Sequence, residues 1–144
     1  GCRIGFDAGG SDRKVSAVID GETVYSEEVV WFPKINSDPD YHYNGIVAAL
    51  KSAAEHMPRV DAVGVSSAGV YINNRTMNAS LFLKVPQDLF DAKVKDIYIR
   101  AITDTFGDIP YNVFNDGDVT ALAGAMSLED TNILGTLFMR YACG

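Results

Sequence analysis

Residues 3–11 read RIGFDAGGS, and this stretch decides the fold that we expect for the chain. Arg3 to Asp7 is a short apolar run of the kind that forms a buried strand. Gly9-Gly10 follows, and two adjacent glycines end a strand in a tight turn. The sequence therefore predicts that the chain opens with a central strand whose last residue is acidic.

Two further strands follow the glycine turn. Val15 to Ile19 is apolar and ends at Asp20-Gly21, which is a strong two-residue hairpin signal. Thr23 to Phe32 is rich in Val, Tyr and Trp, and Pro33 ends it. Three consecutive strands joined by tight turns predict an antiparallel meander.

Helices and strands then alternate. Asp38-Pro39 predicts a helix N-terminus, and apolar residues recur at helical spacing as far as Met57. Residues 71–84 have no clean period and are expected to form an irregular hairpin or excursion. The remaining expected elements are a strand at 60–65, a helix from Pro86 to just before Gly107, a strand at 111–114, a small-residue helix at 116–127 and a strand at 133–139. This order predicts an α/β fold in which helices pack on a mixed five-stranded sheet.

Composition narrows the class of protein. The 144 residues are 47% hydrophobic and 22% charged, with a formal net charge of −7. This balance predicts a folded, cytoplasmic domain, and the negative charge argues against nucleic acid or an anionic membrane as partner. Cys2 and Cys143 are expected to be reduced. His42 and His56 are expected to be ordinary surface or boundary residues, so neither cysteine nor histidine predicts a metal site.

The first candidate site is the turn after the opening strand. A carboxylate such as Asp7 can hold Mg²⁺ through water. Gly9 and Gly10 let backbone N–H groups approach phosphate oxygens, Ser11 adds a donor, and Lys14 or Arg13 adds positive charge. A hairpin turn with a surface aspartate explains the same residues equally well.

The second candidate site is the segment FNDGD at 114–118. It lies between a strand and a helix, where open α/β sheets bind ligands. Asp116 is suited to accept a proton from a substrate hydroxyl while Asn115 holds the neighbouring group. The alternative is that Asp116 or Asp118 caps the helix.

Together these segments resemble the ROK family of sugar kinases. The family carries D-x-G-G-T on its first strand, and this chain has DAGGS at 7–11. Its N-D-A-N-A-A-A-x-G segment is similar to NDGDVTALAG at 115–124, and its G-V-x-x-P-G loop is similar to GVSSAG at 64–69. The A-P-N-L loop resembles NASL at 78–81. The matching segments occur in the same order along nearly the whole chain.

The resemblance implies a fold and a set of roles. It implies an RNase-H-like (actin-like ATPase) domain at 1–130, and at 131–144 the start of a truncated second lobe or an aberrant tail. ATP and Mg²⁺ would be the cofactors, and a hexose or amino sugar would be phosphorylated on a hydroxyl, as in a glucokinase. The implied roles are catalysis by Asp116, sugar binding by Asn115, Asn78 and Asp118, phosphate binding by Gly9, Gly10, Ser11 and Lys14, and metal binding by Asp7.

Three further expectations concern the isolated chain. We expect it to be inactive alone, because the adenosine pocket belongs to the second lobe. We expect a homodimer, with strand 133–139 pairing between chains. We expect Asp7 and Asp116 to face each other across one end of the sheet. The alternative functions are a non-catalytic sugar-sensing ROK domain and an actin-like or activator ATPase domain.

Overall fold

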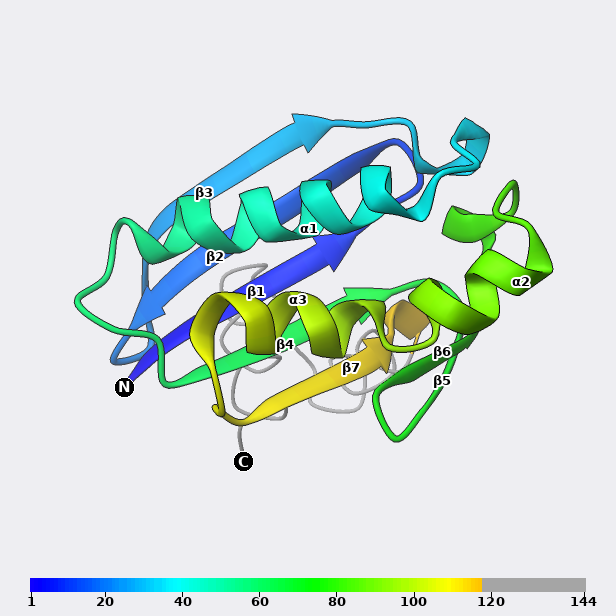
Figure 1. Cartoon of the computed structure of the whole chain (residues 1–144). Helices are drawn as coiled ribbons and strands as arrows, with labels where there is room; N and C mark the ends of the chain where they lie inside the picture. Colours follow the sequence, from blue (N-terminus) through cyan, green and yellow to red (C-terminus); the bar gives the residue numbers. More distant parts are fainter. Residues whose placement is uncertain (118–144) are drawn as a thin grey trace.

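The computed structural model describes residues 1–117 and is built around one mixed sheet (Figure 1). Its strand order is β3-β2-β1-β4-β7. The pairs β1–β2 and β2–β3 are antiparallel, while β1–β4 and β4–β7 are parallel. The expected five-stranded mixed sheet with an antiparallel meander is confirmed. Its strands are β1 (Cys2–Ala8), β2 (Asp12–Ile19), β3 (Glu22–Val30), β4 (Ala62–Ser67) and β7 (Tyr111–Asn115).

Local sequence explains the meander. Asp20 has φ 51° and Gly21 has φ 83°, the left-handed pair that a tight hairpin between two twisted strands requires. In β1 the side chains alternate between buried and less buried positions, because successive residues of a strand point to opposite faces. Strands β1 and β2 are longer than expected, since pairing continues into polar residues such as Asp12, whereas β3 ends at Val30, before the expected Phe32.

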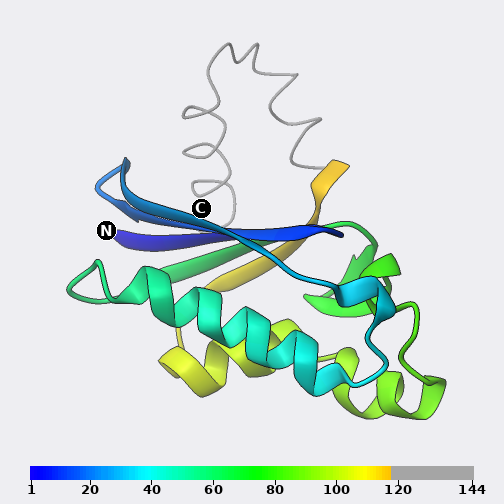
Figure 2. The same cartoon turned by 90° about the horizontal axis from the view of Figure 1, so that it is seen from above.

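Two helices cover one face of this sheet (Figure 2). Helix α1 (Pro39–Ala54) begins where expected, with the Asp38 carboxylate accepting from the backbone N–H of Asp40 at 2.9 Å. Helix α3 (Ile97–Phe106) lies beside it. The core lies between these helices and the sheet, and its largest buried hydrophobic side chains include Ile4, Phe6, Trp31, Ile46, Leu50, Val63, Ile97, Tyr98 and Ile102.

The single helix expected from Pro86 to just before Gly107 is wrong. The chain instead forms a short helix α2 (Gln87–Leu89), a π-helical turn at Phe90–Val94 and then α3. The Lys95 carbonyl accepts from the backbone N–H of Thr76 at 2.8 Å. This hydrogen bond to β6 interrupts the helix. The apolar periodicity of the expected helix does not reveal it.

The irregular stretch contains a small hairpin. Strands β5 (Val70–Ile72) and β6 (Arg75–Asn78) pair antiparallel. Asn73 and Asn74 form its turn with φ 52° and 66°. The Asn74 side chain accepts from the backbone N–H of Val113 at 2.9 Å, so the hairpin is fixed to β7.

The expectation for His42 is wrong, because its side chain is fully buried. Its Nε2 lies 2.8 Å from the Pro33 carbonyl oxygen and 3.0 Å from the Leu81 carbonyl oxygen. These carbonyls belong to two 3-10 turns, η1 (Pro33–Ile35) and η2 (Ser80–Phe82). His56 is exposed, as expected, and its ring stacks on Tyr25 with centroids 3.7 Å apart.

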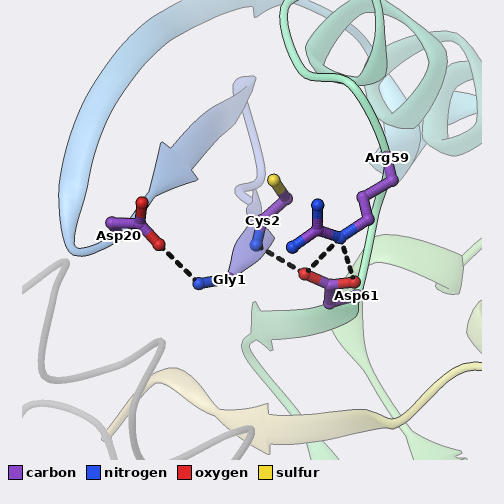
Figure 3. A network of polar contacts seen from close by, with 5 residues as sticks. All are labelled: Gly1, Cys2, Asp20, Arg59 and Asp61. Carbon is purple, nitrogen blue, oxygen red and sulfur yellow. Dashed lines mark hydrogen bonds and ion pairs between the residues drawn. The ribbon is translucent and has the colours of Figure 1, made fainter.

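Polar contacts hold the edge of the sheet where β1 begins (Figure 3). The Asp61 carboxylate accepts from the backbone N–H of Cys2 at 2.8 Å and pairs with Arg59 at 2.9 Å. These two contacts, the Cys2 hydrogen bond foremost, hold the pKa of Asp61 below its usual value. Asp20 pairs with the amino group of Gly1 at 2.7 Å. This network joins the starts of β1 and β4, at the edge opposite the glycine turn.

Several expectations lie outside the described residues. They are the remainder of the helix at 116–127, the strand at 133–139, the segment at 131–144, Asp118 and Cys143. Within residues 1–117, no helix is long and apolar enough to cross a bilayer.

Candidate functional site

The register of the sheet places Asp7 on the face opposite α1 and α3. Asp7 pairs with Lys14 on one side and with Ser66 on the other. Lys14 in turn pairs with Glu28. Directly paired residues point to the same face, so Asp7, Lys14 and Glu28 form one polar row. The next row, through Ala8, points into the helix-covered side, where Ala8 is buried.

Asp7 and Asp116 come together where the parallel strands end. Strands β1, β4 and β7 all run toward this edge, so the residues that follow them meet there. Partial burial raises the pKa of Asp7 above its usual value, Lys14 opposes this, and the negative charges of Asp116 and Asp12 raise it further. The negative charge of Asp116 therefore acts on Asp7 at this edge, and that the two carboxylates face each other stays a prediction.

Trp31 holds the glycine turn in place. Its indole N–H donates to the Gly9 carbonyl at 2.8 Å, and its backbone N–H donates to the Ser11 carbonyl at 3.1 Å. The backbone N–H of Gly9 donates to the Asp12 carbonyl at 3.0 Å, so it is already used inside the turn. In the part of the chain that the structure describes, the N–H groups of Gly10 and Ser11 have no such partner.

The charges around the turn differ from those expected. The Arg13 guanidinium lies 5.5 Å from the centroid of the Trp31 ring, on the helix-covered side. Lys14 faces Asp7 and Glu28, and its positive charge opposes the rise in the pKa of both carboxyls. A hydrogen bond from Asp12 raises the pKa of Glu28 despite this. A third cation, Lys34, lies directly on Gly10.

The helical turn that begins after β7 is capped by Asn115. Its side-chain oxygen accepts from the backbone N–H of Gly117 at 2.8 Å. Whether Asp118 also caps this turn lies outside the described residues. The Asn115 amide group also donates to the Gly69 carbonyl, which joins this turn to the β4–β5 loop.

A groove of about 690 Å³ opens beside that loop. Asn78 lines it together with Ser80 and Gln87, and no charged side chain of residues 1–117 does. Gly69 has φ 132°, and a side chain there would collide with the backbone of Asn78 and Ala79. The apolar part of the lining is Val70, Met77, Ala79, Phe82, Leu83, Val85 and Phe90.

Two tyrosine hydroxyl groups bond to the end of β4 and the loop that follows it. Tyr98 donates to Ser67 Oγ at 3.2 Å, and Tyr71 donates to the Ala68 carbonyl at 2.9 Å. Burial raises the pKa of Tyr71 to about 12, and the charge of Asp116 adds to this rise. The charge of Asp116 therefore acts on both Asp7 and Tyr71.

The donor set at the turn suits a hydrated cation better than a closed metal cage. No group of three or more His, Cys, Asp or Glu side chains within residues 1–117 could hold a metal ion. Mg²⁺ usually keeps several waters and binds through one or two carboxylates and the phosphates of a substrate. Desolvation and nearby negative charge disfavour the ionised form of Asp7, and a cation beside it would offset both effects.

Three residues of this region escaped the sequence analysis: Trp31, Lys34 and Tyr71. Trp31 is the only tryptophan of the chain and precedes the proline that ends the third strand, which is the one available signal. Lys34 lies 24 residues after Gly10 in the sequence, and Tyr71 lies 64 residues after Asp7. Folding therefore brings both of them to the site. No local pattern marks either of them.

Comparison with known proteins gives matches among solved structures alone. No protein-family model and no curated protein matches the sequence. A putative sugar kinase from Cytophaga hutchinsonii matches with a TM-score of 0.63 and 19% identity, over 85% of this chain and 38% of the kinase. A ROK family glucokinase from Streptomyces griseus, in complex with glucose and AMPPNP, matches with a TM-score of 0.59 and 23% identity. That match covers 84% of this chain and 35% of the glucokinase.

The same fold also occurs in a protein with a substrate other than a sugar. RuvC of T. thermophilus, in complex with a Holliday junction substrate, matches with a TM-score of 0.51 and 13% identity, over 96% of this chain and 88% of RuvC. A fold therefore does not decide the function. The chain spans less than two fifths of the length of either kinase. It has the RNase-H-like α/β fold found in the sugar kinases of the ROK family.

Proposed function

We propose that this chain is the N-terminal lobe of an ATP-dependent sugar kinase of ROK type, which phosphorylates a hydroxyl of a hexose or amino sugar. One observation carries the proposal. Asp116 follows β7 at the same sheet edge where β1 carries Asp7. Burial raises the pKa of Asp7 and of Tyr71, and the charge of Asp116 adds to both shifts. Tyr71 is a residue of β5, whose Val70 lines the groove. A base between a phosphate turn and an uncharged groove is the arrangement that phosphoryl transfer to a neutral alcohol requires.

In this proposal each residue has one task. Asp116 accepts the proton of the attacking sugar hydroxyl. Asn78 hydrogen-bonds the sugar in the groove, and Asn115, with Asp118 beyond the described residues, holds the neighbouring hydroxyls. Gly10 and Ser11 donate backbone N–H groups to the transferred phosphate, and Gly9 shapes the turn. Lys14 balances the charge of Asp7 and Glu28.

ATP and Mg²⁺ are the cofactors that this arrangement suits. Asp7 is the residue that would hold the cation through water. When bound, the cation neutralises the charge that develops on the phosphates. We assign no residue of the range 1–117 to binding the adenosine part of the nucleotide.

We propose a cytoplasmic protein that forms a homodimer. The strand expected to pair between chains, 133–139, lies outside the described residues. Light scattering of the 144-residue chain tests the dimer, and a monomer at high concentration contradicts it.

Sugar binding by the chain tests the proposed function. We expect glucose, mannose, N-acetylglucosamine or N-acetylmannosamine to shift the backbone amide resonances of the Asn78 loop in a ¹H–¹⁵N spectrum. Asn78→Ala should weaken this binding about tenfold, because it removes hydrogen bonds in a groove whose other walls are mostly apolar. Asn44→Ala, an equal change on the exposed side of α1, is the matched control.

The alternatives predict different results. Absence of sugar binding across the panel contradicts the kinase and favours an actin-like or activator ATPase domain. Sugar binding without any binding of Mg²⁺–AMPPNP favours a sugar-sensing domain. The acidic chain makes a DNA-bound sensor less favourable, because DNA binding relies on excess positive charge.

A further inference from the structure

The cation that touches the glycine turn comes from a distant segment. An ideal Cβ atom built on Gly10 would lie 2.6 Å from Cε and 2.9 Å from Nζ of Lys34. These distances are shorter than real Cβ contacts, so the Lys34 side chain rests on the bare backbone of Gly10. The missing side chain at position 10 is therefore what admits Lys34 to the turn.

No carboxylate of residues 1–117 forms an ion pair with Lys34. Within residues 1–117, ion pairs at 4 Å or less involve Arg59, Arg75, Lys93, Lys95 and the N-terminus, but not Lys34. Lys14, in contrast, lies in the polar row between Asp7 and Glu28. An incoming anion is therefore attracted by Lys34, while at Lys14 it meets two carboxylates as well.

The backbone that carries Lys34 is fixed to the turn. Three residues earlier, Trp31 donates to the Gly9 and Ser11 carbonyls. The Pro33 carbonyl lies 2.8 Å from Nε2 of the buried His42. Because both flanking contacts are buried or partly buried, the segment needs little further ordering to present the ammonium to a ligand.

We propose that Lys34 binds the terminal phosphates of the phosphoryl donor at the turn formed by Gly9, Gly10 and Ser11, in place of Lys14. A lysine ammonium is a compact point charge with three donors, which suits a phosphate chain. The N–H groups of Gly10 and Ser11 supply the neutral donors beside it. This inference rests on the proposed function, since it concerns the donor side of the same site.

Titration calorimetry on the 144-residue chain tests this role. The two probes are Mg²⁺–AMPPNP and inorganic tripolyphosphate, which separate a nucleotide from a bare phosphate chain. We expect Lys34→Ala to weaken both by roughly tenfold, since a charge-assisted hydrogen bond is lost. Lys34→Arg should stay within about threefold of the original chain. Lys51→Ala, an equal charge change on the exposed part of α1, is the matched control and should leave both affinities unchanged.

A double-mutant cycle isolates the contact with Gly10. Gly10→Ala displaces the flexible end of Lys34, so its effect on tripolyphosphate binding should be smaller in the Lys34→Ala background. Additive effects would overturn the contact. Equal affinities of Lys34→Ala and Lys51→Ala would overturn the proposal, as would no binding of either probe at millimolar concentration. In both of these cases, sugar binding that depends on Asn78 would still support the proposed function.

Discussion

At the scale of single residues, Asp7 is a carboxylate of the site whose ionised form is disfavoured by its surroundings. Protein atoms remove part of its hydration, and Asp116 and Asp12 add negative charge. Lys14 offsets these effects incompletely, because the pKa of Asp7 remains above its usual value. A carboxylate kept in such a place disfavours the folded state at neutral pH, which is a common cost of binding sites.

Asp7→Asn should therefore stabilise the fold at pH 7. A raised pKa in the folded state means that protonation of Asp7 favours folding below about pH 4 and that this advantage is lost as the pH rises. Removing the charge should raise the free energy of unfolding at pH 7 by up to about 1 kcal/mol, since the side chain still reaches solvent. The gain should vanish at pH 3. Urea unfolding at both pH values measures it.

The control for this prediction is Asp108→Asn, an exposed carboxylate outside the site. It should change the unfolding free energy by less than about 0.5 kcal/mol at either pH. If Asp7→Asn destabilises the chain at pH 7, then Lys14 outweighs the desolvation and the repulsion, and the account of Asp7 is wrong.

At the scale of elements, α1 joins the two 3-10 turns that flank the site. Nε2 of His42 reaches the carbonyls of Pro33 in η1 and Leu81 in η2. Lys34 follows Pro33, and Ser80, next to Leu81, lines the groove. The side proposed for phosphate and the side proposed for sugar are thus held by one buried imidazole. The bonding requires that Nε2 carry the proton.

His42→Phe should loosen both turns. Phenylalanine can fill the aromatic cluster with Phe82 but leaves two buried carbonyls without their donor. The free energy of unfolding should fall by about 1–3 kcal/mol. Urea unfolding measures the loss, and His56→Phe is the control because exposed His56 only stacks on Tyr25. Equal stability of the two variants would show that water replaces the histidine at these carbonyls.

At the scale of the whole molecule, the chain supplies one wall of the proposed site. It spans 38% and 35% of the lengths of the two kinases compared above. The carboxyl edge of the sheet carries the proposed base and phosphate turn. Phosphoryl transfer depends mainly on holding both substrates in line, so one wall is not expected to be enough.

The 144-residue chain alone should therefore release no ADP with any sugar. Lost positioning removes on the order of 7–11 kcal/mol of barrier lowering, which a single carboxylate cannot replace. A coupled assay for ADP with glucose, mannose, fructose, N-acetylglucosamine and N-acetylmannosamine is the measurement. Turnover above background that disappears in Asp116→Ala would refute this prediction.

The amino-acid sequence by itself determined the features that depend on neighbours along the chain. The Asp20-Gly21 turn follows from backbone preferences of two residues, and the Asp38 cap follows from a side chain and an N–H two residues away. Alternating burial in β1 follows from strand geometry. Strand order then placed Asp7 and Asp116 at one edge, because parallel strands share their carboxyl ends.

Only the tertiary structure decided the features that join distant segments. His42 is buried because two turns, 9 and 39 residues away in the sequence, place their carbonyls beside its ring. The expected helix breaks at Lys95 because its carbonyl accepts a hydrogen bond from Thr76, and the Asn115 amide group joins the end of β7 to Gly69. Lys34 rather than Lys14 lies on the turn, because Gly10 leaves space for a side chain that arrives from η1. Such contacts depend on packing in three dimensions, which no local pattern of residues specifies.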